Sequence, residues 1–184
     1  VPSDAPKRAP QAEITDTADL LAEYTGRESS AMTDSFDPTP EQINAATLVE
    51  ELPLGDDQVL KVALLNKPTR GDRVQAQLAL RFGTAQELTG LRTIGTATAQ
   101  LLDRGIERLN RQEIMDTFNE LQANVSFSGA ANGVDVHIST VKEHFEDTVA
   151  LVAEILKTPT FPVRELEKYK AQRITAINNA KSEP

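Results

Sequence analysis

The stretch DRVQAQLALRF at residues 72–82 decides the fold class, because its apolar and polar residues alternate. One side of the pattern carries Val74, Ala76, Leu78, Leu80 and Phe82, and the other carries Arg73, Gln75, Gln77 and Arg81. Successive side chains of a strand point to opposite faces, so a period of two predicts a strand with one buried face.

The preceding segment QVLKVALL, residues 58–65, is rich in β-branched and aliphatic residues and predicts another strand. Lys67-Pro68-Thr69-Arg70-Gly71 between the two segments has the composition of a turn. We therefore expect the two strands to pair as a hairpin.

Two helices are expected next. The first covers residues 93–104 and ends at Gly105, which suits the left-handed position after a helix. The second begins at Asn110, with Glu113 three residues later as its capping-box partner. Its apolar stripe is predicted to consist of Ile114, Phe118 and Leu121.

A second pair of strands and a second pair of helices follow. The strands contain Val125 and Phe127, then Val134, Val136 and Ile138, with Asn132-Gly133 as the hairpin signal between them. A long helix is expected over residues 142–157, and a last helix over residues 162–180. The inward residues of the long helix are predicted to be Phe145, Val149, Val152 and Leu156. This order predicts an α+β fold, an antiparallel sheet with helices packed on one face.

Composition places the chain among soluble globular proteins. Its 184 residues are 39% hydrophobic and 26% charged, and no apolar run reaches the length of a membrane span. There is no cysteine, so disulfides, thiolate metal sites and cysteine nucleophiles are excluded.

The net charge of -9 comes from the N-terminal segment. Residues 1–57 hold 13 acidic and 3 basic residues, whereas residues 58–184 hold 15 and 16. An acidic arm repels phosphates, so nucleic acid is not an expected partner. We interpret residues 1–47 as an acidic, proline-containing linker with short helices, one within residues 14–24 and one starting at Thr39-Pro40. Residues 48–184 are expected to form the α+β domain, cut before its final strands.

Three segments resemble the pitrilysin/insulinase family of zinc metallopeptidases. VALLNKPTRGDRVQAQLALRFGTA (62–85) is similar to the opening strands of a half-domain of that family. Residues 90–129 are similar to its helix pair and following strand, and residues 136–184 to its next strand and two helices. FDPTPEQINAAT (36–47) resembles the linker between the two halves of bacterial members. The resemblance implies two similar halves that close around peptide substrates.

Catalytic halves of the family carry an inverted zinc motif, H-x-x-E-H, on the first helix, and a glutamate on the last helix. The resemblance puts Thr96 and Gln100 at the histidine positions and Ala99 at the general base. The third ligand falls at Ala176, beside Thr175. None of these side chains holds zinc or acts as a base near neutral pH. We therefore expect the non-catalytic half, with no catalytic, metal-binding or cofactor-binding residue. The small residues 95–99 are expected to pack this helix closely onto the sheet.

The sequence gives only weak indications of other metal-binding or ligand-binding sites. His137 and His144 are the only histidines, and Asp135 or Glu143 would have to complete a metal site. Their spacing is not that of a helical ligand pair, so we expect two solvent-facing histidines. The last helix has a mixed-charge face with Arg164, Glu165, Glu167, Lys168, Lys170 and Arg173. Such a face is usually solvated. The other interpretation is that it faces the peptide chamber or a partner half.

The leading hypothesis is a non-catalytic half that closes a peptide chamber and binds substrate. Its partners would be a homologous catalytic half, on the same chain or another, and a peptide, with zinc held by that other half. The resemblance implies a periplasmic or secreted location. Two alternatives stay open: a structural or chaperone-like relative without peptidase activity, and an unrelated α+β module that binds a small ligand.

Overall fold

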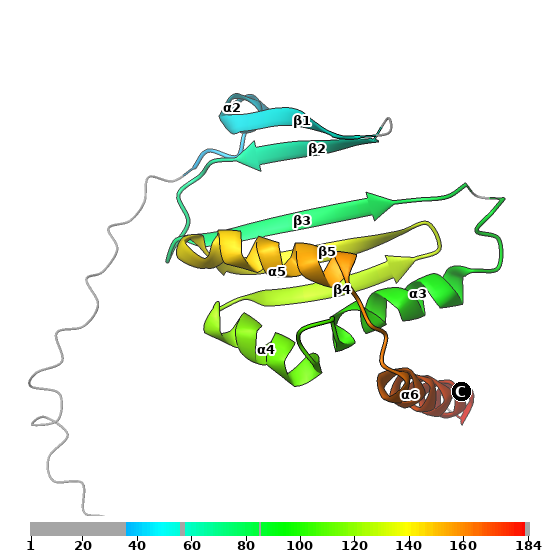
Figure 1. Cartoon of the computed structure of the whole chain (residues 1–184). Helices are drawn as coiled ribbons and strands as arrows, with labels where there is room; N and C mark the ends of the chain where they lie inside the picture. The colour runs from blue at the N-terminus through cyan, green and yellow to red at the C-terminus, as the bar shows by residue number, and fades with distance from the viewer. Residues whose placement is uncertain (1–35, 56–57, 85, 183–184) are drawn as a thin grey trace, which may run out of the picture. The chain divides into compact units, whose positions relative to one another are not determined.

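The computed structural model describes residues 36–55, 58–84 and 86–182 (Figure 1). In chain order the elements are α2 (Pro40–Ala46), β1 (Thr47–Gly55), β2 (Gln58–Leu65), β3 (Arg73–Arg81), α3 (Arg92–Leu101), the 3-10 turn η1 (Leu102–Arg104), α4 (Arg111–Glu120), β4 (Asn124–Ala130), β5 (Gly133–Val141), the 3-10 turn η2 (Lys142–His144), α5 (Phe145–Lys157) and α6 (Val163–Ser182). The helix expected within residues 14–24 lies outside the described residues. Across the described ranges no helix combines the length and apolarity that a membrane crossing requires.

The central sheet has three antiparallel strands in the order β3-β5-β4 (Figure 1). In its register Leu78 of β3 lies opposite Val136 of β5, which lies opposite Phe127 of β4. β1 and β2 form a separate antiparallel pair, with Leu52 opposite Leu60.

This pairing corrects the predicted hairpin. β2 pairs with β1, and β3 pairs with β5, so the turn-like segment after β2 joins two sheets. β1 was hidden in the sequence because Pro53 and an acidic pair interrupt its apolar pattern. It pairs with the strand that comes next in sequence, with Gly55 opposite Gln58, and closing a short stretch of chain costs little entropy.

Helices cover one face of the central sheet, as the sequence predicts. The buried core joins Val136 and Ile138 of β5 and Phe127 of β4 to residues of the helical layer. The helical layer supplies Ala99, Leu102, Ile106, Ile114, Phe118, Leu151, Val152 and Ile155. On the opposite face of the sheet His137 and Ser126 are exposed. The α+β prediction with helices on one face is therefore confirmed.

The buried face of α5 differs from the predicted stripe. Thr148, Leu151, Val152 and Ile155 are buried, while Val149 is 39% exposed. Phe145 and Leu156 are only half-buried. Thr148 can enter the core because its hydroxyl donates to the His144 carbonyl at 2.7 Å, which satisfies the polar group inside the helix. The predicted stripe was chosen from apolar residues alone. It therefore left out this threonine and placed the buried face of the helix incorrectly.

Two glycines have a different role from the predicted one. Gly105 follows η1 with φ 162°, an extended conformation, and a Cβ there would lie 2.9 Å from the Thr160 hydroxyl oxygen. The β4–β5 turn is centred on residues 131–132, and a Cβ on Gly133 would overlap the Leu80 carbonyl oxygen. Both positions need glycine for close approach of another segment rather than for a left-handed turn.

Candidate functional site

Helix α3 lies directly along the outer edge of β4. A Cβ on Gly95 would overlap the Ala130 carbonyl oxygen, and a Cβ on Gly129 would lie 2.6 Å from the Ala99 Cβ. Ala99 itself is completely buried. Only glycine and alanine permit this approach, so the predicted close packing of the small residues on α3 is confirmed.

Two polar side chains of α3 bind the edge of β4. Gln100 donates from Nε2 to the Phe127 carbonyl at 3.0 Å. Thr96 donates to the Arg92 carbonyl at 2.9 Å, with a longer contact of 3.4 Å to the Gly129 carbonyl. Because β4 is an outer strand, its outward carbonyls need partners from outside the sheet. Thr96 and Gln100 supply them and are thereby held against the strand.

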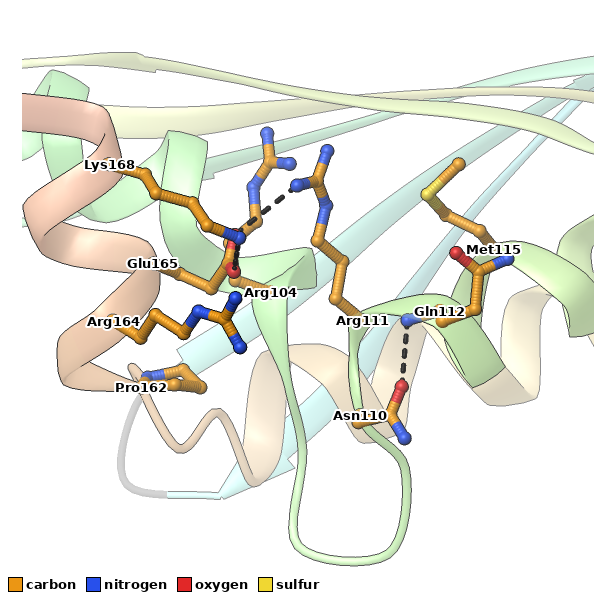
Figure 2. Close-up of a pocket in the computed structure, with 9 residues that line it drawn as sticks. All are labelled: Arg104, Asn110, Arg111, Gln112, Met115, Pro162, Arg164, Glu165 and Lys168. Atoms are coloured by element: carbon orange, nitrogen blue, oxygen red, sulfur yellow. Dashed lines mark hydrogen bonds and ion pairs between the residues drawn. The ribbon is translucent and has the colours of Figure 1, made fainter. Parts of the chain in front are cut away.

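A basic pocket of about 530 Å³ lies where η1, α4 and the start of α6 meet (Figure 2). We call it the basic pocket; its lining residues are Arg104, Asn110, Arg111, Gln112, Met115, Pro162, Arg164, Glu165 and Lys168. Four of these nine residues are cationic and one is anionic. A smaller cavity of about 110 Å³ continues from it towards Tyr169 and Gln172 of α6.

Glu165 is the anion at the centre of the basic pocket. Its side chain is only 13% exposed and accepts from Lys168 at 2.6 Å and from Arg111 at 3.3 Å. The hydrogen bond from Lys168 lowers the pKa of Glu165 below its usual value, and the nearby positive charges act in the same direction. Glu165 is therefore ionised at neutral pH and ties α6 to α4.

Arg104 closes the inner side of the pocket. Its Nε donates to the Gln100 carbonyl at 3.0 Å and lies 3.1 Å from an Asp103 carboxylate oxygen. Burial raises the pKa of Asp103, while the charge of Arg104 opposes this shift. These contacts fix the Arg104 side chain, which is 24% exposed, at the wall of the pocket.

Acidic groups of the described residues do not fully neutralise the positive charges of Arg111 and Arg164. Within the described part of the chain, Arg111 has one ion pair, the 3.3 Å contact with Glu165, and Arg164 has neither an ion pair nor a hydrogen bond from its side chain. Figure 2 shows the two guanidinium groups extending from opposite walls, Arg111 from α4 and Arg164 from α6. The arrangement is suited to holding an anion between two forked donors.

Comparison with solved structures assigns the fold. A peptidase M16 inactive domain from Pseudomonas fluorescens superposes with a TM-score of 0.61 and 19% identity, over 74% of this chain and 32% of that one. The chain has the fold of a peptidase M16 inactive domain. The periplasmic protease PqqL from Escherichia coli superposes with a TM-score of 0.55 and 14% identity, over 92% of this chain and 20% of PqqL. No protein-family model matches the sequence, and no curated protein matches it.

The M16 inactive-domain fold agrees with the resemblance to a non-catalytic pitrilysin/insulinase half. The chain spans about a third of the length of the Pseudomonas structure and a fifth of that of PqqL. At these identities the similarity establishes the fold and leaves activity to be argued from the residues of this chain.

The residues at the zinc positions do not fit the metal. Thr96 and Gln100 are engaged by backbone carbonyls, and Ala99 is packed against β4. On α6, Ala176 is exposed, and the Thr175 hydroxyl donates to the Ala171 carbonyl at 3.0 Å. Zinc requires several imidazole, thiolate or carboxylate donors at one point, and the three side chains near α3 are methyl, hydroxyl and amide groups. No mechanistic step through zinc follows from this domain.

The two histidines occupy different places. His137 lies in the middle of β5 on the exposed face, as predicted, whereas His144 ends η2 and is half-buried, so it is not fully solvent-facing. Asp135 is engaged by Arg81 at 2.8 Å. Across residues 36–55, 58–84 and 86–182, no group of three or more histidine or acidic residues is placed to hold a metal ion.

The sequence pointed to half of the basic pocket. It singled out Arg164, Glu165 and Lys168 in the mixed-charge face of the last helix, in which Glu167 and Lys170 form an ion pair of 2.8 Å. It did not connect these residues with Arg104 and Arg111, which are 53 to 64 positions away in sequence. Only the packing of α6 against η1 and α4 brings the four cations together.

Proposed function

We propose that this chain is the non-catalytic half-domain of an M16-like metallopeptidase. It closes a peptide chamber and binds peptide, while a homologous half on the same or another chain holds zinc. The observation that carries the proposal is the closed α3–β4 interface within an M16 inactive-domain fold. There, Gln100 donates to the strand edge, and Thr96 donates within its own helix and makes a longer contact with the same edge.

The second support is the basic pocket. A binding half needs surface that attracts a peptide, and this chain offers a cavity with four cations between α4 and α6. The cavity shares α6 with the vacated zinc positions, and η1, which supplies Arg104, directly follows α3. Arg104 is one helical turn beyond Gln100, and Lys168 is two turns before Ala176.

We also propose a periplasmic or secreted location for the parent protein. PqqL, which shares the fold, is a periplasmic protease. A cysteine-free chain is compatible with that compartment and carries no thiol that an oxidising environment would alter.

The proposal is tested by measuring binding and cleavage in one sample. The full chain is mixed with zinc and a set of internally quenched, fluorescein-labelled peptides of eight to twenty residues. We expect a saturable increase in anisotropy without any increase in fluorescence intensity. An increase in intensity that a chelator abolishes would show hydrolysis and refute the assignment. The absence of any anisotropy change with every peptide would refute the binding role.

A further inference from the structure

We propose that the basic pocket binds a carboxylate of the peptide, either its C-terminal carboxylate or an acidic side chain. This inference rests on the proposed peptide-binding function and names the chemical group that this chain recognises. The two forked donors are Arg111 and Arg164, and Lys168 and Arg104 supply positive potential behind them.

The first argument is the balance of charge inside the pocket. The charge of Lys168 is paired with that of Glu165, and the charge of Arg104 is paired with that of Asp103. Arg111 shares Glu165 at the longer distance of 3.3 Å, and 42% of its side chain is exposed. Within the described ranges Arg164 is left without a partner. The surplus charge is therefore on the guanidinium groups of Arg111, from α4, and Arg164, from α6, and in Figure 2 the Glu165 carboxylate lies between the two in this view.

The second argument is the shape and chemistry of the lining. An arginine guanidinium binds a carboxylate through two parallel N–H···O bonds, so two arginines on opposite walls can hold one carboxylate group. Met115, which is 46% exposed, and Pro162 add apolar surface beside the cations. A volume of about 530 Å³ accommodates a carboxylate together with the residue that carries it.

The third argument excludes a polyanion. Nucleic acid needs a long basic surface that contacts many phosphates. Here the pocket gathers only four cationic side chains, and residues 58–184 as a whole are nearly neutral, with 15 acidic residues against 16 basic ones. A single anionic group on an otherwise uncharged peptide fits this distribution better.

The pocket also lies where a peptide would be held without being cut. Lys168 precedes Ala176 by eight residues on α6, which corresponds to about 12 Å along the helix. The pocket therefore lies about two helical turns from the α6 position that bears a zinc ligand in catalytic halves.

The test uses one eight-residue peptide of alanine, leucine and serine, labelled with an uncharged fluorophore, in three forms. The first has a free C-terminal carboxylate, the second a C-terminal amide, and the third an amide plus one internal glutamate. Affinity for the full chain is measured by anisotropy. We expect the free acid, the glutamate form or both to bind at least about ten-fold more tightly than the neutral amide, a difference of about 1.4 kcal/mol. Preference for the first or the third form identifies the source of the carboxylate.

Arg164→Gln is the decisive variant, because Arg164 has no side-chain partner in the described structure whose loss would disturb the fold. We expect it to remove most of the preference for the carboxylate, while Arg164→Lys retains part of it because the charge stays but the forked geometry is lost. Arg173→Gln is the matched control. It removes an equally exposed charge from the same helix outside the pocket and should leave the preference unchanged.

The outcomes separate this inference from the proposed function. If all three peptides bind equally well and Arg164→Gln changes nothing, the carboxylate site is refuted and the peptide-binding half is not. If Arg164→Gln and Arg173→Gln weaken binding to the same extent, the effect is general electrostatic attraction and the pocket is refuted. If none of the three peptides binds, the inference fails, and the proposed function fails with it when the peptides of eight to twenty residues also give no anisotropy change.

Discussion

Replacing Gly95 by alanine tests the close packing of α3 on β4 most sharply. The added Cβ would overlap the Ala130 carbonyl oxygen, a backbone atom fixed by the β4–β5 hairpin. Because a backbone atom cannot rotate away like the end of a side chain, α3 has to shift outward. The shift also stretches the Gln100–Phe127 hydrogen bond.

The expected change in the free energy of unfolding is the difference between a packing cost and a gain in helix propensity. Forcing an extra methyl into a closely packed site costs about 1–3 kcal/mol, and contact with a backbone atom favours the upper end of that range. Alanine gains about 1 kcal/mol over glycine in a helix interior. We therefore expect a net loss of about 2 kcal/mol, equivalent to a decrease in Tm of about 4–8 °C for a chain of this size.

The assay is urea and thermal unfolding of the full chain followed by far-UV circular dichroism. Thr98→Ala is the control, because Thr98 is exposed on the same helix and its substitution adds no atom at the interface. Gly129→Ala acts from the other side, where a Cβ would lie 2.6 Å from the Gly95 carbonyl oxygen. Since both changes push the same two elements apart, the double variant should lose less than the sum of the single losses. A Gly95→Ala chain as stable as the parent, or more stable, would refute the close approach.

Three further predictions concern contacts around the site. Asn110→Ala removes the capping box of α4 and should lower the free energy of unfolding by about 1 kcal/mol in urea titrations. Gln100→Ala leaves the Phe127 carbonyl without its side-chain donor and should cost about 1–2 kcal/mol, whereas an isosteric Gln100→Glu should not restore the bond at neutral pH. The hydrogen bond from Arg108 lowers the pKa of Glu154, so their contribution to stability is present above about pH 4.3 and is lost as the pH falls through the lowered pKa. Arg108→Gln should therefore make the acid side of the stability–pH curve shallower, and an unchanged curve would contradict this.

Local sequence signals predicted most of the elements of the fold. The alternation in 72–82 predicted a strand that the structure has at 73–81, and the aliphatic run in 58–65 predicted β2 with its observed bounds. The Asn110 capping box is present as predicted. These features depend on interactions within a few residues, which a sequence displays directly. The one-sided helical layer follows from the same patterns.

Strand pairing was less predictable. The sequence placed β2 against β3 because they are neighbours with a turn between them, but β2 has a closer partner in β1. β3 instead pairs with β5, whose residues lie about 60 positions away. Such pairings depend on which apolar faces can be buried together, and no local pattern records that.

For the candidate site, too, the sequence showed the residue types but not their neighbours in space. The sequence itself shows that Thr96, Ala99 and Gln100 are not of zinc-ligand type. Their new role was not, because it requires the β4 edge to lie beside α3. The basic pocket likewise needed the contact between Arg111 and Glu165, which joins α4 to α6.

The measurement that tests the central claim most directly is the zinc content of the chain after saturation and desalting, determined by elemental analysis. The account predicts zinc far below one ion per chain, and no change in Tm on adding zinc, since a ligand that binds only the folded state would raise it. One tightly held zinc ion per chain, accompanied by a raised Tm and lost on Gln100→Ala, would contradict the account.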